Sequence, residues 1–141
     1  MRPAQLLYFS SKRSLGPGGI FTLQDEARAS NEKAGITGVL LFNRSYFLQV
    51  LEGGREQTTR AFTRIAADPR HHGVTLMSFQ EVERRDFADW SMGLVDSTSP
   101  ELSVALKDFL PVYDLVPAEL SVDAAMGMLR RMHDMRLTVR R

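Results

Sequence analysis

Apolar residues recur in short runs with a period of two, the pattern that predicts β-strands. The predicted strands cover residues 5–10, 35–42, 46–51, 74–83 and 90–95. Only Asn43, Arg44 and Ser45 separate the second run from the third, a spacing typical of a β-hairpin. We expect the rest of the chain to be arranged around this hairpin.

Helical periodicity appears between these strands and after them. Residues 22–33 predict a helix with Thr22 as its N-cap, and residues 55–67 predict a second helix that Asp68 and Pro69 end. The buried side of the second helix is expected to carry Ala61, Phe62, Ile65 and Ala66. A short helix at 101–109, a connection at 111–117 and a helix from residue 121 follow.

The order β-α-β-β-α-β-β predicts an α+β fold close to the ferredoxin-like split unit. We expect an antiparallel or mixed five-stranded sheet with two helices on one face and the C-terminal helices on or near the other. The last helix has an apolar stripe at three- and four-residue steps, formed by Val122, Ala125, Met126, Leu129 and Met132. This stripe either covers the second face of the sheet or packs on another subunit, and we favour the first.

Composition narrows the class of protein. A chain of 141 residues is long enough for one domain, and without cysteine it has no disulfide and no thiolate nucleophile. No apolar run reaches the roughly 18–20 residues of a membrane helix, and the first residues lack a secretory signal, so we expect a cytoplasmic protein without membrane contact. A net charge of +1 gives no electrostatic case for nucleic acid.

One polar residue stands out within the hairpin. Strand alternation places Phe47, Gln49 and Leu51 on the same face, so a carboxamide lies among apolar neighbours. A buried amide without partners costs about 1–3 kcal/mol. Gln49 is therefore expected to have dedicated hydrogen-bonding partners in protein, water or ligand.

The sequence does not predict catalytic machinery. His71, His72 and His133 lack the spacing of a metal site, and no GxSxG elbow is present. Glu52 and Asp68 are not an obvious catalytic pair. These observations favour a binding or sensing module over an enzyme.

Five motifs together resemble BLUF domains, the sensors of blue light using FAD. They are Tyr8 followed by Ser10, Asn31 ahead of GITG, FLQVLEG around Gln49, DPRH from Asp68 to His71, and WSM from Trp90 to Met92. The likeness covers residues 5–96. It implies a flavin-binding photosensor domain at 1–97 and a C-terminal helical extension at 98–141 in the same structural unit.

The resemblance also implies roles for individual residues. Tyr8 matches the tyrosine that gives an electron and a proton to the excited flavin, and Gln49 matches the glutamine that bridges this tyrosine and the flavin. Asn31 matches the asparagine that holds the pyrimidine edge of the ring. Without the resemblance these residues are a core tyrosine, a core amide and a helix C-cap.

The resemblance also implies roles for two further sets of residues. The polar edge of the flavin and its ribityl-phosphate tail are assigned to Arg64, Asp68, Arg70 and His71, which otherwise form a solvated helix end. Trp90 and Met92 match the pair that relays the signal, and their spacing on the fifth predicted strand makes them face the same side. Without the resemblance, Trp90 and Met92 are interpreted as side chains that fill the core. Ser30 departs from the family, since several relatives carry His or Asn there.

The implied function is a blue-light photoreceptor that binds FAD non-covalently, with FMN or riboflavin as substitutes. It switches a hydrogen-bond network of tyrosine, glutamine and flavin. Signalling then runs through a homo-oligomer that binds a separate cytoplasmic protein in a light-dependent way, with the apolar stripe and the 90–95 edge as its surface. The alternatives are an acylphosphatase-type enzyme, whose anion loop residues 11–19 do not match, and a flavin-free interaction module.

Overall fold

The computed structural model describes residues 2–105, 107 and 115–139. Its elements are β1 (Ala4–Lys12), α1 (Gly19–Ala34), β2 (Thr37–Phe42), β3 (Tyr46–Gly53), α2 (Arg55–Ala67), β4 (His71–Glu81), β5 (Gly93–Asp96), α3 (Pro100–Ala105), the 3₁₀ turn η1 (Pro117–Glu119) and α4 (Val122–Asp134). The last part of the predicted helix 101–109 and most of the predicted connection 111–117 lie outside the described residues. Within the described part of the chain, no helix is both long and apolar enough to span a membrane.

The five strands form one mixed sheet in the order β4-β1-β3-β2-β5. Strand β1 pairs antiparallel with β3 and β4, β2 pairs antiparallel with β3, and β2 pairs parallel with β5. The predicted hairpin is confirmed as β2 and β3, with the Asn43 side chain accepting the main-chain amides of Ser45 and Tyr46 at the turn. The α+β, ferredoxin-like fold expected from the sequence is confirmed.

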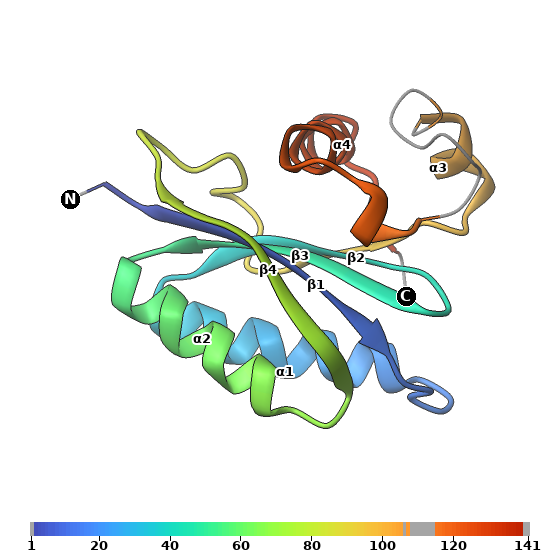
Figure 1. Ribbon diagram of the computed structural model, residues 1–141, viewed down its shortest axis with the longest axis horizontal. Helices are drawn as coiled ribbons and strands as arrows, with labels where there is room; N and C mark the ends of the chain where they lie inside the picture. The colour runs from blue at the N-terminus through green and yellow to red at the C-terminus, as the bar shows by residue number, and fades with distance from the viewer. Residues whose placement is uncertain (1, 106, 108–114, 140–141) are drawn as a thin grey trace.

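Helices cover both faces of this sheet (Figure 1). Helices α1 and α2 lie on one face, where their side chains join Leu6, Tyr8, Phe47 and Leu51 in one core cluster. Helix α4 lies on the other face and shares the second cluster with alternate strand residues such as Leu48 and Val50. We call the cluster between the sheet and helices α1 and α2 the lower cluster, and the cluster between the sheet and helix α4 the upper cluster. The alternation predicted for β3 is confirmed by this division.

The apolar stripe of the last helix packs on its own sheet. Ala125, Met126, Leu129 and Met132 are buried in the upper cluster, and Val122 packs against it. The favoured expectation, that the stripe covers the second face within the same chain, is confirmed. The stripe is therefore not a free surface for a partner, which corrects its predicted role in signalling.

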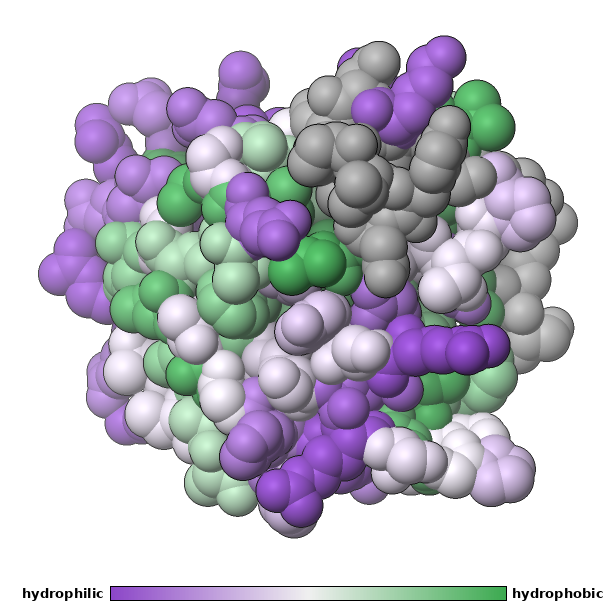
Figure 2. All heavy atoms as spheres, turned by 45° about the vertical axis from the view of Figure 1, so that its right-hand side comes forward, coloured by the Kyte–Doolittle hydropathy of each residue, from purple (hydrophilic) through white to green (hydrophobic). Residues whose placement is uncertain are grey.

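Large apolar side chains remain exposed at few of the described positions. Leu76 on β4 is 49% exposed, Val104 on α3 is 69% exposed and Met135 after α4 is 52% exposed. On the face that Figure 2 presents, apolar side chains gather to the left of centre, with hydrophilic side chains around them.

Helix α1 begins earlier than the sequence predicts. Its N-cap is Gly18 in the left-handed conformation, with φ of 70°, and the Thr22 hydroxyl donates to the Gly18 carbonyl one turn into the helix. The prediction of Thr22 as N-cap is therefore wrong, because Gly18 reaches the left-handed conformation without a Cβ clash. Helix α2 has the predicted bounds, although Ala66 is exposed and Thr58 is buried instead.

The fifth strand begins later than predicted, at Gly93. Trp90 and Met92 lie in the loop before it, so the prediction that both are strand residues facing one side is wrong. The reason lies in helix α1: Asn31 Nδ2 donates to the Ser91 carbonyl at 2.9 Å, and Gln24 Nε2 donates to the Met92 carbonyl at 3.1 Å. These side chains take the carbonyl groups that would otherwise join a strand ladder.

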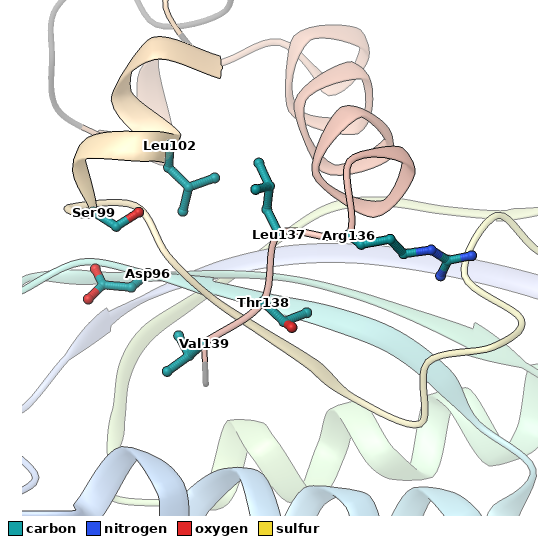
Figure 3. Close-up of a pocket in the computed structure, with 7 residues that line it drawn as sticks. All are labelled: Asp96, Ser99, Leu102, Arg136, Leu137, Thr138 and Val139. Carbon is teal, nitrogen blue, oxygen red and sulfur yellow. The ribbon is translucent and has the colours of Figure 1, made fainter. Parts of the chain in front are cut away.

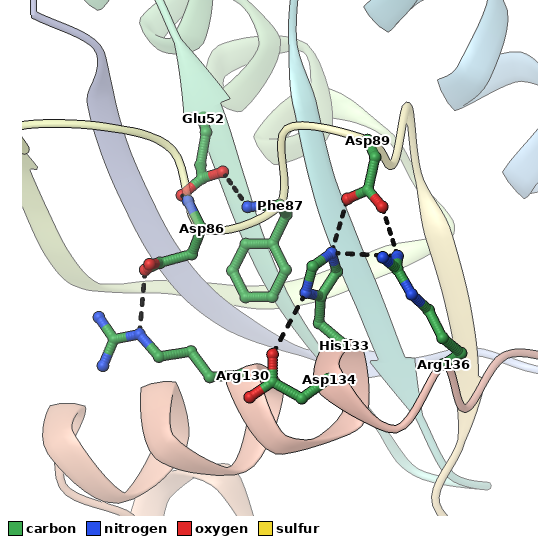
Figure 4. A network of polar contacts seen from close by, with 8 residues as sticks. All are labelled: Glu52, Asp86, Phe87, Asp89, Arg130, His133, Asp134 and Arg136. Carbon is green, nitrogen blue, oxygen red and sulfur yellow. Dashed lines mark hydrogen bonds and ion pairs between the residues drawn. The ribbon is translucent and has the colours of Figure 1, made fainter.

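The β4–β5 loop is anchored by Glu52, a fully buried carboxylate on β3. Its oxygens accept the main-chain amides of Asp86 and Phe87, each at 2.8 Å (Figure 4). They also accept the side-chain amide of Gln5 at 2.8 Å. Three donors thus compensate the desolvation of this buried carboxylate. Glu52 fixes the part of the loop that leads to Trp90 and Met92.

Candidate functional site

Tyr8 and Gln49 are direct neighbours across the β1–β3 pair. Both side chains are buried on the face that α1 and α2 cover, and the Tyr8 hydroxyl donates a hydrogen bond to Gln49 Oε1. The register explains this contact, since opposed residues in an antiparallel pair place their side chains on the same face. The dedicated partner expected for the buried Gln49 amide is therefore a tyrosine hydroxyl.

Burial also sets the protonation state of Tyr8. The loss of solvent at this fully buried position raises the pKa of the Tyr8 phenol well above its usual range, and the negative charge of Asp68 raises it further. Tyr8 is accordingly neutral near pH 7, and its proton lies on the bond to Gln49.

The other end of the Gln49 amide contacts a sulfur atom. Gln49 Nε2 donates to Met92 Sδ at 3.1 Å, and Met92 is 1% exposed. A thioether sulfur accepts hydrogen bonds weakly and donates none. Gln49 therefore connects Tyr8 on β1 to the residue that precedes β5.

A cavity of about 190 Å³ opens beside Gln49, between α1 and α2. Its apolar wall comprises Leu23, Ala27, Leu51, Ala61 and Ile65. Its polar groups belong to Glu26, Ser30, Asn31, Gln49, Arg64, Asp68, Arg70 and His71. A concave site that joins an apolar wall to convergent polar groups suits a small molecule with both an apolar part and a polar part.

Asn31 links this cavity to the β4–β5 loop. Its amide nitrogen holds the Ser91 carbonyl, while its side-chain oxygen accepts no hydrogen bond from any described residue. The residue is 4% exposed and lines the cavity, so its side-chain oxygen is left for a donor inside the cavity. A ligand with a donor group could satisfy this oxygen.

Charged groups surround the open end of the cavity. Arg70 forms ion pairs with Asp68 at 2.6 Å and with Glu26 of α1 at 2.7 Å. The hydrogen bond from Arg70 is the main cause that lowers the pKa of Asp68, and the same bond raises the pKa of Arg70. Arg64 has no charged partner among the described residues and lines the same cavity.

His71 closes the cavity next to the sheet. Its Nδ1 lies 2.8 Å from the Ser10 hydroxyl, and its ring centroid lies 4.7 Å from that of Phe47. Burial lowers the pKa of His71 to about 4. The imidazole is therefore neutral near pH 7.

The structure brings most of the predicted site residues to one place. Asn31, Gln49, Arg64, Asp68, Arg70 and His71 all line the cavity. Tyr8 and Met92 lie directly behind Gln49. Trp90 is elsewhere: it packs against the upper cluster, and its ring centroid is 4.7 Å from that of His133 on α4.

Sequence reasoning missed two polar residues of α1. Gln24 is 5% exposed and holds the Met92 carbonyl, and Glu26 pairs with Arg70 across the cavity. Gln24 and Asn31 are seven residues apart, about two helical turns, and so share a face. That spacing was the available signal for Gln24.

Comparison with known proteins decides the family. The model of the family described as sensors of blue-light using FAD, BLUF, matches residues 4–93. The chain belongs to the BLUF family. It is thus a member of a family of flavin-using light sensors and not of a family of enzymes, as the sequence predicted.

Solved BLUF proteins share the whole architecture. The dark-state structure of BlrB, a BLUF protein, matches with a TM-score of 0.81 and 31% identity over 96% of this chain and 98% of that one. The photo-activated state of BlsA matches with a TM-score of 0.76 and 26% identity over 90% and 91% of the two chains. Both alignments extend beyond the segment that the family model covers.

Curated relatives are longer proteins. The blue light- and temperature-regulated antirepressor BluF of Escherichia coli (strain K12) is 37% identical over 70 residues, which are 50% of this chain and 17% of that protein. The photoactivated adenylate cyclase subunit beta of Euglena gracilis is 29% identical over 91 residues, 62% of this chain and 11% of that protein. This chain therefore spans less than a fifth of each of these relatives.

Proposed function

We propose that this BLUF chain is a blue-light receptor that binds FAD non-covalently in the cavity between α1 and α2. Blue light switches the hydrogen bonds among Tyr8, Gln49 and the flavin, and the switch alters affinity for another protein. The observation that carries the proposal is the buried hydrogen bond from the Tyr8 hydroxyl to Gln49, a residue that also lines the cavity.

The chemistry of the cavity suits a flavin. Its apolar side chains from α1 and α2 would hold a flat aromatic ring, and the free Asn31 oxygen would accept an N–H from it. Arg64 and Arg70 would bind phosphate oxygens. FMN or riboflavin would use the apolar part of the same cavity, while FAD would also use the cationic groups.

When bound, the flavin supplies the chromophore and an acceptor for one electron. Tyr8 is neutral, so loss of an electron makes its phenolic proton strongly acidic, and Gln49 Oε1 is the acceptor in direct contact. Because both groups are buried, water does not compete for that proton. Tyr8 and Gln49 together therefore hold the proton that the light reaction moves.

The side-chain amide of Gln49 has two chemically different ends, an N–H donor and an oxygen acceptor. In the present orientation its N–H points to Met92 Sδ and its oxygen to Tyr8. Rotation or tautomerisation of the amide would change what it offers on both sides, and Met92 has no donor for an amide oxygen. Met92 thereby favours one orientation over the other, and the pair forms a two-state element that light can bias.

The proposed organisation is a photosensor at residues 1–97 with an extension at 98–141 in the same structural unit. The packing of α4 on the sheet supports this, because the extension is in contact with the loop that carries Trp90. Since the E. coli relative is named an antirepressor, we propose that the output is binding to a separate cytoplasmic protein, by a homo-oligomer of this chain.

Spectroscopy of two variants tests the proposal. Tyr8→Phe and Gln49→Leu should both retain bound flavin and lose the light-induced red shift of its absorption, since each removes one partner of the hydrogen bond. Tyr46→Phe, on the opposite face of β3, is the matched control and should shift like the parent. A normal red shift in either test variant, or purified protein that takes up no flavin, would refute the assignment.

A further inference from the structure

The chain that follows α4 lies along the outer edge of the sheet. The Leu137 amide donates to the Met132 carbonyl at 3.0 Å as the helix ends, and the Val139 amide donates to the Leu94 carbonyl of β5 at 2.7 Å. We call residues 136–139 the edge segment. Figure 3 shows it descending from α4 to a position beside β5.

Strand β5 stands at the end of the strand order and, among the strands of the described residues, pairs with β2 alone. The Ser97 amide donates inward to the Phe42 carbonyl of β2, so by alternation the main-chain groups of Leu94 and Asp96 face outward. Outward-facing main-chain groups on an edge strand form a template that an extended chain can pair with. The edge segment occupies this template at Leu94.

The edge segment bridges both core clusters. Leu137 packs against the upper cluster and Val139 packs against the lower cluster, with Thr138 between them. Its first residue, Arg136, is ion-paired with Asp89 of the loop that carries Trp90 (Figure 4). The segment thus has an apolar–polar–apolar order and is held at both ends.

The contact with β5 is nevertheless small. Among the described residues, the Val139 bond is the one main-chain hydrogen bond between the edge segment and β5. A cavity of about 550 Å³ lies between the edge segment, the start of α3 and the end of β5, with Asp96, Ser99 and Leu102 in its lining. Within the described part of the chain the edge is therefore covered at one point, and a cavity lies next to it.

We propose that the outer edge of β5 is the docking surface for an extended segment of a partner protein with apolar, polar and apolar residues in succession. The edge segment occupies this surface, and the partner displaces it by donating its own amide to Leu94. The inference rests on the proposed function only in taking the occupant to be the signalling partner. Since β5 begins directly after Met92, the docking point at Leu94 is two residues from the proposed switch.

A peptide that copies residues 135–140, labelled with fluorescein, is the probe. Val139→Pro removes the amide that donates to Leu94, whereas Val139→Thr keeps both the amide and the branched shape. In the dark, the full-length Val139→Pro protein should bind the probe about tenfold more tightly than the parent, because the competing segment is released. Val139→Thr should bind it like the parent, and a probe with proline in place of its valine should bind neither variant.

Hydrogen exchange supplies the second measurement. In the parent, the Val139 amide should be protected in a manner independent of protein concentration. An unprotected Val139 amide, or no gain of probe binding in folded Val139→Pro, would overturn the proposal. Protection that increases with protein concentration would mean that a second copy of this chain covers the edge, and it would overturn the proposal as well. None of these readouts requires photochemistry, so they fail independently of the proposed light reaction.

Discussion

Trp90 and Met92 are two residues apart in the chain and belong to different cores. Met92 is buried in the lower cluster, where its sulfur accepts the Gln49 amide, and Trp90 packs against the upper cluster beside His133 of α4. The chain crosses the edge of the sheet between them. A rearrangement at Gln49 therefore has a covalent route of two residues to the face that α4 covers.

Two variants of Met92 separate the effect of its side-chain volume on stability from the effect of its sulfur on the lit state. Met92→Ala should destabilise the protein by about 2–5 kcal/mol through the cavity it leaves, and Met92→Leu by less than about 1.5 kcal/mol. Both remove the acceptor of Gln49 Nε2, so both should change the lifetime of the red-shifted state while the red shift itself persists. Denaturant unfolding and dark recovery after a blue flash measure the two effects. A parental lifetime in Met92→Leu would exclude the sulfur from the switch.

Asp89 is the contact between the Trp90 loop and the end of α4. It accepts His133 Nε2 at 2.6 Å and also pairs with Arg136, and these bonds lower the pKa of Asp89 to about 2. The group is half exposed, so Asp89→Asn should cost less than about 1 kcal/mol in stability. We expect it to keep the red shift and to reduce the light-induced change in hydrogen exchange along α4.

Glu56→Gln is the matched control for Asp89→Asn, since it removes an exposed ion pair with Arg60 on α2. It should leave both the red shift and the exchange of α4 unchanged. Equal light-induced exchange in Asp89→Asn and the parent would show that the signal does not pass through this contact.

The hairpin and the unusual Gln49 were predictable because strand alternation is a local rule. Apolar neighbours at positions 47 and 51 were enough to show that an amide at 49 lies on a buried face, and the structure agrees. The stripe of α4 was predictable for the same reason, as its helical period is complete within one helix.

The start of β5 was not predictable from local pattern. Residues 90–95 read as an apolar strand, but Gln24 and Asn31 bind the carbonyls of Met92 and Ser91 over separations of 68 and 60 residues. No residue near Trp90 in the sequence indicates that these distant side-chain amides bind the carbonyls. Glu52 shows the same limit, because its burial depends on amides of a loop 34 and 35 residues away.

Glu26 should affect which flavin the cavity prefers. Its carboxylate shares the Arg70 guanidinium with Asp68, so Glu26→Gln leaves more of that positive charge for a phosphate. The affinity for FMN and FAD should rise about threefold to fivefold relative to riboflavin, as expected for a part-exposed ion pair of roughly 1 kcal/mol. Glu32→Gln, on the same helix but outside this cavity, is the control. Flavin titrations measure these affinities, and an equal rise in the affinity for riboflavin would contradict the prediction.

His71 should make stability depend on pH in a defined window. Its pKa is about 4 in the folded protein and about 6.5 when unfolded, so between these values the unfolded chain binds more protons. The stabilisation is complete above pH 6.5 and is lost as pH falls toward 4, by up to about 3 kcal/mol. His71→Asn removes the titrating group and should flatten the curve in this window, whereas His72→Asn, an exposed neighbour, should not. Asp68 and Asp89, whose pKa values are lowered, contribute losses at lower pH, below about 4. Urea unfolding at half-unit pH steps measures the slope, and parallel curves for the parent and His71→Asn between pH 4 and 6.5 would show that the imidazole is not held neutral by burial.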